Sequence, residues 1–100
     1  MEIRWTSEAS RNLEEIYSYI YIENPKAAEK TVSEIYSRVQ LLKRHPEIGY
    51  HYEHRDRRDI RVILYGHYKI AYLKIDSNTL DILGVFHGAM DLSKHLKLPG

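Results

Sequence analysis

The chain has 100 residues, a formal net charge of +1 at pH 7 and no cysteine. This length fits one domain, residues 1–100, and is too short to add a deep cofactor cavity to a core, so we expect no cofactor. The missing cysteines exclude disulfides and thiolate metal sites, the near-zero charge argues against nonspecific nucleic-acid binding, and the lack of a long apolar run or signal peptide predicts a cytoplasmic protein with no membrane partner.

The N-terminal part predicts a strand and two helices. Residues 2–6 alternate apolar and polar side chains, which is typical of a short strand. Thr6-Ser7 offers N-caps for a helix whose apolar positions recur every three or four residues as far as about Glu23. Asn24-Pro25 predicts a second helix start, because asparagine caps well and proline suits the first helical position. So short a connection makes the two helices an antiparallel hairpin.

The C-terminal part predicts strands. The second helix should end at Pro46, and residues 46–59 should form a polar loop. The apolar period then changes from about 3.6 to about 2 residues, which predicts an antiparallel meander of three strands. These strands are residues 60–65, 68–75 and 79–86. Asp91 can cap a last short helix, whose Leu92 and Leu96 should cover the open end of the core.

This order of elements predicts a two-layer α+β domain. The helical hairpin packs on one face of an antiparallel β-sheet, and the short helix closes the C-terminal end. The N-terminal strand should pair with a strand of the meander, but the pattern leaves open which one.

Four segments together carry a family resemblance. They are WTSEASRNLEEIYSYI (5–20), LLKRHPEIG (41–49), IRVILYGHYKIAY (60–72) and ILGVFHGAMDLSKHL (82–96). Their order and spacing resemble the RelE/ParE superfamily of toxins from bacterial type II toxin–antitoxin systems. The last segment, with a histidine, two residues, Met-Asp and a later His-Leu after an apolar strand, is most similar to the ParE branch.

The resemblance implies a toxin that binds and inhibits DNA gyrase and is neutralised by a cognate antitoxin. The residues expected to contact the target are Arg58, Arg61, His87, Met90, Asp91 and Lys94. Antitoxins of this family wrap an extended or helical segment over the helices and the sheet, which predicts an apolar groove there. Tyr17, Tyr21 and Tyr36 are the expected antitoxin contacts, with mutual packing of their rings as the structural alternative.

Two other hypotheses remain open. The first is a RelE-like, ribosome-dependent mRNA endoribonuclease, in which His87 acts as acid or base while Arg61 and Lys69 hold the phosphate. Its structural alternative is that the two cations are solvated sheet residues and that His87 ends a strand by bonding to backbone. The dipeptide Ala89-Met90, where that branch often carries cations, and the missing C-terminal tyrosine favour the ParE branch. The second hypothesis is an antitoxin-binding module that has lost its toxicity.

Strand register decides whether Arg61 and Lys69 can share a phosphate. An even number of residues between the first two meander strands places the two side chains on opposite faces of the sheet. An odd connection, such as residues 65–67, places them on one face.

The remaining charged segment predicts no chemistry of its own. Arg55, Arg57 and Arg58, with His51 and His54, form a basic loop that could contact nucleic acid or the acidic tail of a partner. Acidic residues interrupt it, so a solvated loop with internal ion pairs is the favoured interpretation. The histidines show neither an HExxH motif nor helical i, i+4 spacing beside a carboxylate, so we expect no metal site.

Overall fold

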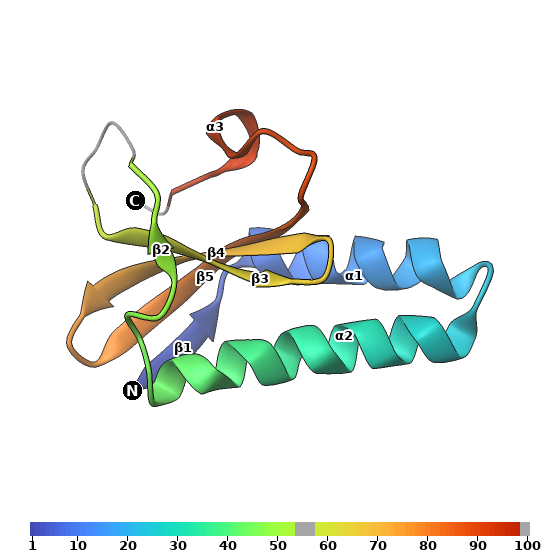
Figure 1. Ribbon diagram of the computed structural model, residues 1–100, viewed down its shortest axis with the longest axis horizontal. Coiled ribbons are helices and arrows are strands. Elements are labelled where there is room, and N and C mark those ends of the chain that lie inside the picture. The colour runs from blue at the N-terminus through green and yellow to red at the C-terminus, as the bar shows by residue number, and fades with distance from the viewer. Residues whose placement is uncertain (54–57, 99–100) are drawn as a thin grey trace.

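The computed structural model describes residues 1–53 and 58–98 (Figure 1). The helices are α1 (Ser7–Tyr21), α2 (Pro25–Gln40), the 3-10 turn η1 (Leu41–Lys43) and α3 (Leu92–His95). The strands are β1 (Glu2–Trp5), β2 (Tyr50–His51), β3 (Ile60–Tyr65), β4 (Tyr68–Asp76) and β5 (Thr79–His87). The predicted strand, hairpin, meander and short last helix are confirmed, and β2 is a strand within the segment predicted as loop. Within the described residues, no helix combines the length and hydropathy needed to cross a membrane.

The five strands form one sheet in the order β1-β5-β4-β3-β2. The pairs β2–β3, β3–β4 and β4–β5 are antiparallel. The sheet is nevertheless mixed, because β1 pairs in parallel with β5, with Ile3 opposite Leu80. A parallel pair needs a long crossover connection, and the helical hairpin with strands β2, β3 and β4 supplies it.

Side-chain caps start both long helices as the sequence predicts. Thr6 Oγ1 accepts a hydrogen bond from the Ala9 N–H at 3.1 Å. The same hydroxyl donates to the Ile82 carbonyl at 2.8 Å, which ties the start of α1 to β5. Asn24 Oδ1 accepts from the Ala27 N–H at 3.0 Å and so caps α2.

The sheet is apolar on both faces. The face under the hairpin carries a buried cluster of Ala9, Ile35, Val39, Leu42, Ile63, Ile70, Tyr72, Leu80, Ile82 and Val85. The opposite face carries Ile60, Val62, Ala71, Leu73, Leu83, Phe86 and Leu92. Figure 1 shows α1 and α2 on one side of the sheet and α3 on the other. Leu92 and Leu96, predicted to cover the open end of the core, pack on this second face, where β4 and β5 also present apolar residues.

A β-bulge in β5 sets the face on which that strand ends. Ile82 pairs with Tyr72, and the pairing then skips Leu83. The extra residue shifts the alternation, so Val85 joins Ile82 in the cluster under the hairpin. His87, two residues later, lies on the same side of the sheet.

Gly84 lies within this bulge, where a side chain has no room. Asn12 Oδ1, from α1, accepts a hydrogen bond from the Val85 N–H at 3.1 Å. A Cβ atom at Gly84 would lie 2.3 Å from Phe86 Cζ and 3.0 Å from Asn12 Oδ1. We therefore expect Gly84→Ala to lower the free energy of unfolding by about 1 to 3 kcal/mol, because the buried Phe86 ring must move. Urea unfolding measures the change; Ser33→Ala, on the exposed side of α2, is the control, and equal stability of the two variants would contradict the packing argument.

Candidate functional site

An apolar groove lies between α1 and α2 beside the end of β1; we call it the hairpin groove. Its volume is about 530 Å³, and its lining is Trp5, Ser10, Leu13, Glu14, Tyr17, Ser18, Val32 and Tyr36. The Trp5 and Tyr36 rings stack with centroids 6.2 Å apart and planes inclined by 11°. The apolar groove expected over the helices and the sheet is therefore present between the two helices, beside the end of β1.

Two of the three tyrosines expected to contact an antitoxin line the hairpin groove. Tyr17 and Tyr36 face it from the two helices. Tyr21 is outside the lining formed by the described residues and packs on Tyr17, with ring centroids 5.5 Å apart. Sequence reasoning missed Trp5, which it treated as part of a short strand. The signal was present, because the sole tryptophan of the sequence ends an edge strand next to a helix start.

A second groove, which we call the C-terminal groove, lies on the other side of α1. Its volume is about 320 Å³, and its lining is Asn12, Glu15, Ile16, Tyr19, Tyr68, Val85, Phe86, His87 and Met90. Two of the predicted target contacts, His87 and Met90, thus share one surface. Tyr19 is 82% exposed at the rim and was not predicted. Two further predicted contacts, Asp91 and Lys94, are exposed; Asp91 follows Met90 directly in the chain, and Lys94 is in α3.

His87 is held by backbone at the end of β5. Its Nδ1 accepts a hydrogen bond from the Ala89 N–H at 3.2 Å. The ring stacks on His67 with centroids 6.2 Å apart and meets the edge of Tyr68 at 6.0 Å. This arrangement matches the structural alternative for His87, in which the ring ends the strand through a backbone contact.

Asp91 holds the start of α3. One of its carboxylate oxygens accepts from the Ser93 N–H at 2.9 Å and from the Ser93 hydroxyl at 2.7 Å. Both hydrogen bonds lower the pKa of Asp91 below its usual value, and the bond from the Ser93 hydroxyl has the larger effect. The capping prediction is therefore confirmed.

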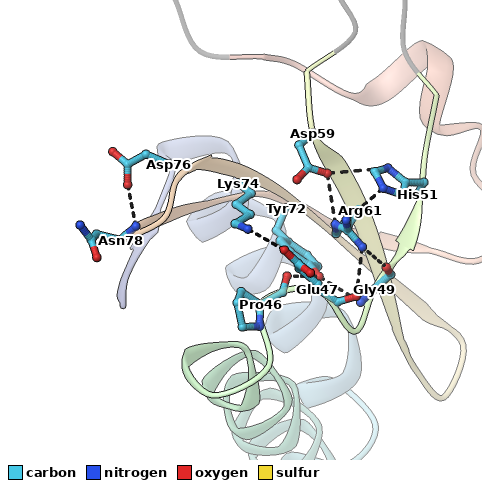
Figure 2. Close-up of polar contacts among 10 residues, drawn as sticks. All are labelled: Pro46, Glu47, Gly49, His51, Asp59, Arg61, Tyr72, Lys74, Asp76 and Asn78. Carbon is cyan, nitrogen blue, oxygen red and sulfur yellow. Dashed lines mark hydrogen bonds and ion pairs between the residues drawn. The ribbon is translucent and has the colours of Figure 1, made fainter.

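The Arg61 guanidinium makes its hydrogen bonds to other residues of the same domain (Figure 2). Its Nε donates to the Asp59 carboxylate at 3.1 Å, and Nη1 donates to the Glu47 and Gly49 carbonyls at 3.0 and 3.2 Å. Nη2 lies 3.0 Å from His51 Nε2, and the side chain is only 14% exposed. The guanidinium therefore pins the segment before β2 to β3.

Tyr72 anchors the same segment from beneath (Figure 2). Its buried hydroxyl donates to the Pro46 carbonyl at 2.8 Å and accepts from the Gly49 N–H at 3.0 Å. Burial raises the pKa of Tyr72 above its usual value, so the hydroxyl stays protonated and can donate.

We expect Tyr72→Phe to lower the free energy of unfolding by about 2 kcal/mol, because two backbone groups lose their partner in the interior. Chemical denaturation measures the loss. Tyr50→Phe removes the hydroxyl of an exposed tyrosine and should leave stability unchanged. An equally small effect of both substitutions would contradict an anchoring role for Tyr72.

The register separates Arg61 from Lys69. Tyr65 pairs with Tyr68, so the connection between β3 and β4 has an even number of residues. Arg61 therefore lies on the hairpin face and Lys69 on the opposite face. The structure does not form the joint phosphate site that an odd connection would have allowed.

His87 is also distant from Arg61. His87 pairs with Tyr68, whereas Arg61 pairs with Tyr72, four positions further along β4. At about 3.3 Å per residue, this offset alone is about 13 Å. The three residues of the nuclease hypothesis thus do not meet in one site.

The basic loop is described only in part. Arg58 is exposed, and His51 Nδ1 lies 3.7 Å from the Asp59 carboxylate. The other cations predicted in this loop, His54, Arg55 and Arg57, lie outside the described residues.

Comparison with known proteins places the chain among toxins. The family described as the ParE toxin of the type II toxin-antitoxin system, parDE, matches residues 3–92. The chain is similar to a structure of the chromosomal ParDE TA system from P. aeruginosa, with 20% identity, a TM-score of 0.71, and coverage of 87% of this chain and 95% of that chain. It is also similar to the toxin-antitoxin complex RelBE2 from Mycobacterium tuberculosis, with 24% identity, a TM-score of 0.57, and coverage of 85% and 94%. No curated protein sequence matches the chain.

Proposed function

Since the chain belongs to the ParE toxin family of type II toxin–antitoxin systems, we propose that it inhibits DNA gyrase by binding and is neutralised by a cognate antitoxin. The family match over residues 3–92 is the observation that carries this proposal. A gyrase inhibitor works where the chromosome is, so the proposal includes a cytoplasmic location.

The hairpin groove supports an antitoxin segment as its occupant. Its floor is apolar and aromatic, with Trp5 stacked on Tyr36. Burying such rings in an interface contributes strongly to affinity, and tryptophan and tyrosine are typical anchors. Glu14 at the rim favours a segment that adds a cation beside its apolar side chains.

The C-terminal groove supports a separate surface for the target. It contains Met90, an adaptable apolar contact, and the imidazole of His87. Its α1 residues, such as Ile16 and Tyr19, point away from the α1 residues of the hairpin groove, because these two sets occupy opposite sides of one helix. The toxin thus offers one groove to each partner.

The geometry of the charged residues favours binding over RNA cleavage. Arg61 is occupied by internal contacts, and Lys69 lies on the opposite face of the sheet. A phosphate-cleaving site needs its acid, base and cations within hydrogen-bond reach of one substrate. Ribosome-dependent mRNA cleavage is therefore the second candidate, and the following experiment separates the two.

Expression of this chain alone in a bacterial host is expected to arrest growth. Coexpression of the short gene beside its own is expected to restore growth. In arrested cells, plasmids should lose negative supercoils while mRNA stays intact. Cleaved mRNA with normal supercoiling would contradict gyrase inhibition, and normal growth would contradict toxicity itself.

A further inference from the structure

The outer edge of β1 is open. β1 is the first strand in the sheet order, and its inner neighbour is β5. The Glu2 N–H donates to the Asn78 carbonyl at 2.7 Å, so the backbone of Glu2 points to β5. Backbone groups of alternate residues point to alternate sides of a strand, so those of Ile3 point outward. Within residues 1–53 and 58–98, no strand lies on that outer side.

Two side chains of opposite charge flank Ile3 on the sheet face away from the hairpin. Ile3 itself packs against the buried cluster under the hairpin. Side chains alternate along a strand, so Glu2 and Arg4 lie on the other face. The Arg4 Nε donates to the Asp81 carboxylate at 2.7 Å, and the Arg4 side chain stays 52% exposed. In the described part of the chain, the Glu2 carboxylate makes no hydrogen bond or salt bridge.

These charges make β1 complementary to a second copy of itself in one antiparallel register. An antiparallel pair joined through the outward backbone groups can be centred within the strand on Glu2, Ile3 or Arg4. Centring on Glu2 or Arg4 places two like charges directly opposite each other, which destabilises the pair. Centring on Ile3 instead places the Glu2 of each copy opposite the Arg4 of the other. The charges therefore select the register centred on Ile3.

The hairpin face of this register is apolar. Ile3 lies opposite Ile3 of the second copy, and Met1 of each copy lies opposite Trp5 of the other. All three residues are partly buried and pack against the cluster under the hairpin. Trp5 also lines the hairpin groove, so the second copy contributes its Met1 to the rim of that groove.

We propose that two copies of this chain pair through their β1 edges in a two-fold, antiparallel dimer centred on Ile3. The Ile3 N–H of each copy donates to the Ile3 carbonyl of the other, and two Glu2–Arg4 ion pairs flank these bonds. β1 has only four residues, so the buried area is small and the dimer is reversible. The dimer covers Trp5, so a second copy and any other occupant of the hairpin groove exclude each other.

Sedimentation of the purified chain alone, over about a hundredfold range of concentration, is expected to show a monomer–dimer equilibrium. Glu2→Lys places a lysine opposite each Arg4 and should raise the dimer dissociation constant by about tenfold or more. Glu29→Lys makes the same charge change at an exposed position of α2 and should stay within about twofold of the parent. In the parent, exchange of the Ile3 amide should slow as the concentration rises, which tests the edge without a substitution.

A single cysteine tests the register, because the chain has no cysteine of its own. Ile3→Cys places two thiols opposite each other, where the Cα atoms of a hydrogen-bonded antiparallel pair are about 5.5 Å apart and within reach of a disulfide. With oxidised glutathione, this variant should form covalent dimers at least about tenfold faster than Ile75→Cys, whose cysteine is exposed outside β1.

The possible failures are distinguishable. Sedimentation as a monomer at every concentration, with unchanged Ile3 exchange, would overturn the dimer. A dimer that Glu2→Lys and Glu29→Lys affect equally, or equal cross-linking of the two cysteine variants, would overturn its placement at β1. These measurements use the chain alone, so they do not depend on the proposed gyrase and antitoxin partners. Failure of gyrase inhibition would overturn the proposed function and leave the dimer standing.

Discussion

Replacing Trp5 with alanine is expected to weaken the antitoxin complex by about 2 to 4 kcal/mol, or roughly 30- to 1,000-fold in Kd. Trp5 lines the hairpin groove and stacks on Tyr36. Truncation therefore removes an aromatic ring from the groove and also the ring against which Tyr36 packs. Trp5→Phe keeps an aromatic ring there and should recover most of the affinity. Titration calorimetry with the purified antitoxin measures Kd for the parent, the Trp5→Ala and the Trp5→Phe proteins.

Ile75→Ala provides the matched control for this substitution. Ile75 is an exposed apolar residue of β4 that lines neither groove, so its truncation should leave Kd within about threefold. Thermal unfolding must show that the Trp5→Ala protein remains folded. A folded Trp5→Ala protein that binds the antitoxin as tightly as the parent would contradict the assignment of the hairpin groove.

Replacing Met90 with glutamate is expected to raise the concentration needed for gyrase inhibition by about 30-fold or more. Met90 lines the C-terminal groove beside Phe86 and His87, and a carboxylate at this position would be desolvated against apolar walls when the target binds. Affinity for the antitoxin should change by less than about threefold, because the hairpin groove lies on the other side of α1. A supercoiling assay and a binding titration on the same preparation measure the two effects.

Ile75→Glu introduces the same charge at an exposed apolar position outside both grooves. It should leave gyrase inhibition and antitoxin binding unchanged. Equal loss of inhibition in both variants would mean that added negative charge, and not the groove, is responsible. Full inhibition by the Met90→Glu protein would remove the C-terminal groove as the target surface.

The secondary structure could be predicted because local rules agreed with one another along the chain. Asn24 followed by Pro25 fixed the restart of the hairpin, and the structure shows that cap. The change to alternating apolar residues placed the start of β3 at Ile60. The direction of β1 could not be predicted, since four alternating residues carry no information about which neighbour they join or with what polarity.

The bulge in β5, which sets the face on which that strand ends, depends on contacts between distant residues. The bulge at Leu83 is held by a bond between Asn12 and the Val85 N–H, 73 positions apart, and no local pattern announces it. Both faces of β5 were apolar, so periodicity could not assign Leu92 to one of them.

The candidate site was only partly predictable for the same reason. Arg61 was chosen because a cation on a strand is a plausible ligand for phosphate or a partner. Its actual partners are the carbonyls of Glu47 and Gly49, whose positions depend on the fold of the preceding loop. Met90 and His87 were predicted together as target contacts, and they line one groove with Tyr19, which was not predicted. The sequence thus shows which side chains have the chemistry to bind a partner, but it does not show which of them are already engaged in contacts within the fold.

The most direct test of the proposed function uses purified components. DNA gyrase, relaxed plasmid and ATP are incubated with increasing amounts of this protein, and a cell-free translation reaction receives the same amounts. We predict that supercoiling stops, that it resumes when the antitoxin is added, and that mRNA in the translation reaction stays intact. Unimpaired supercoiling at a large molar excess of the protein, together with cleaved mRNA, would contradict the account.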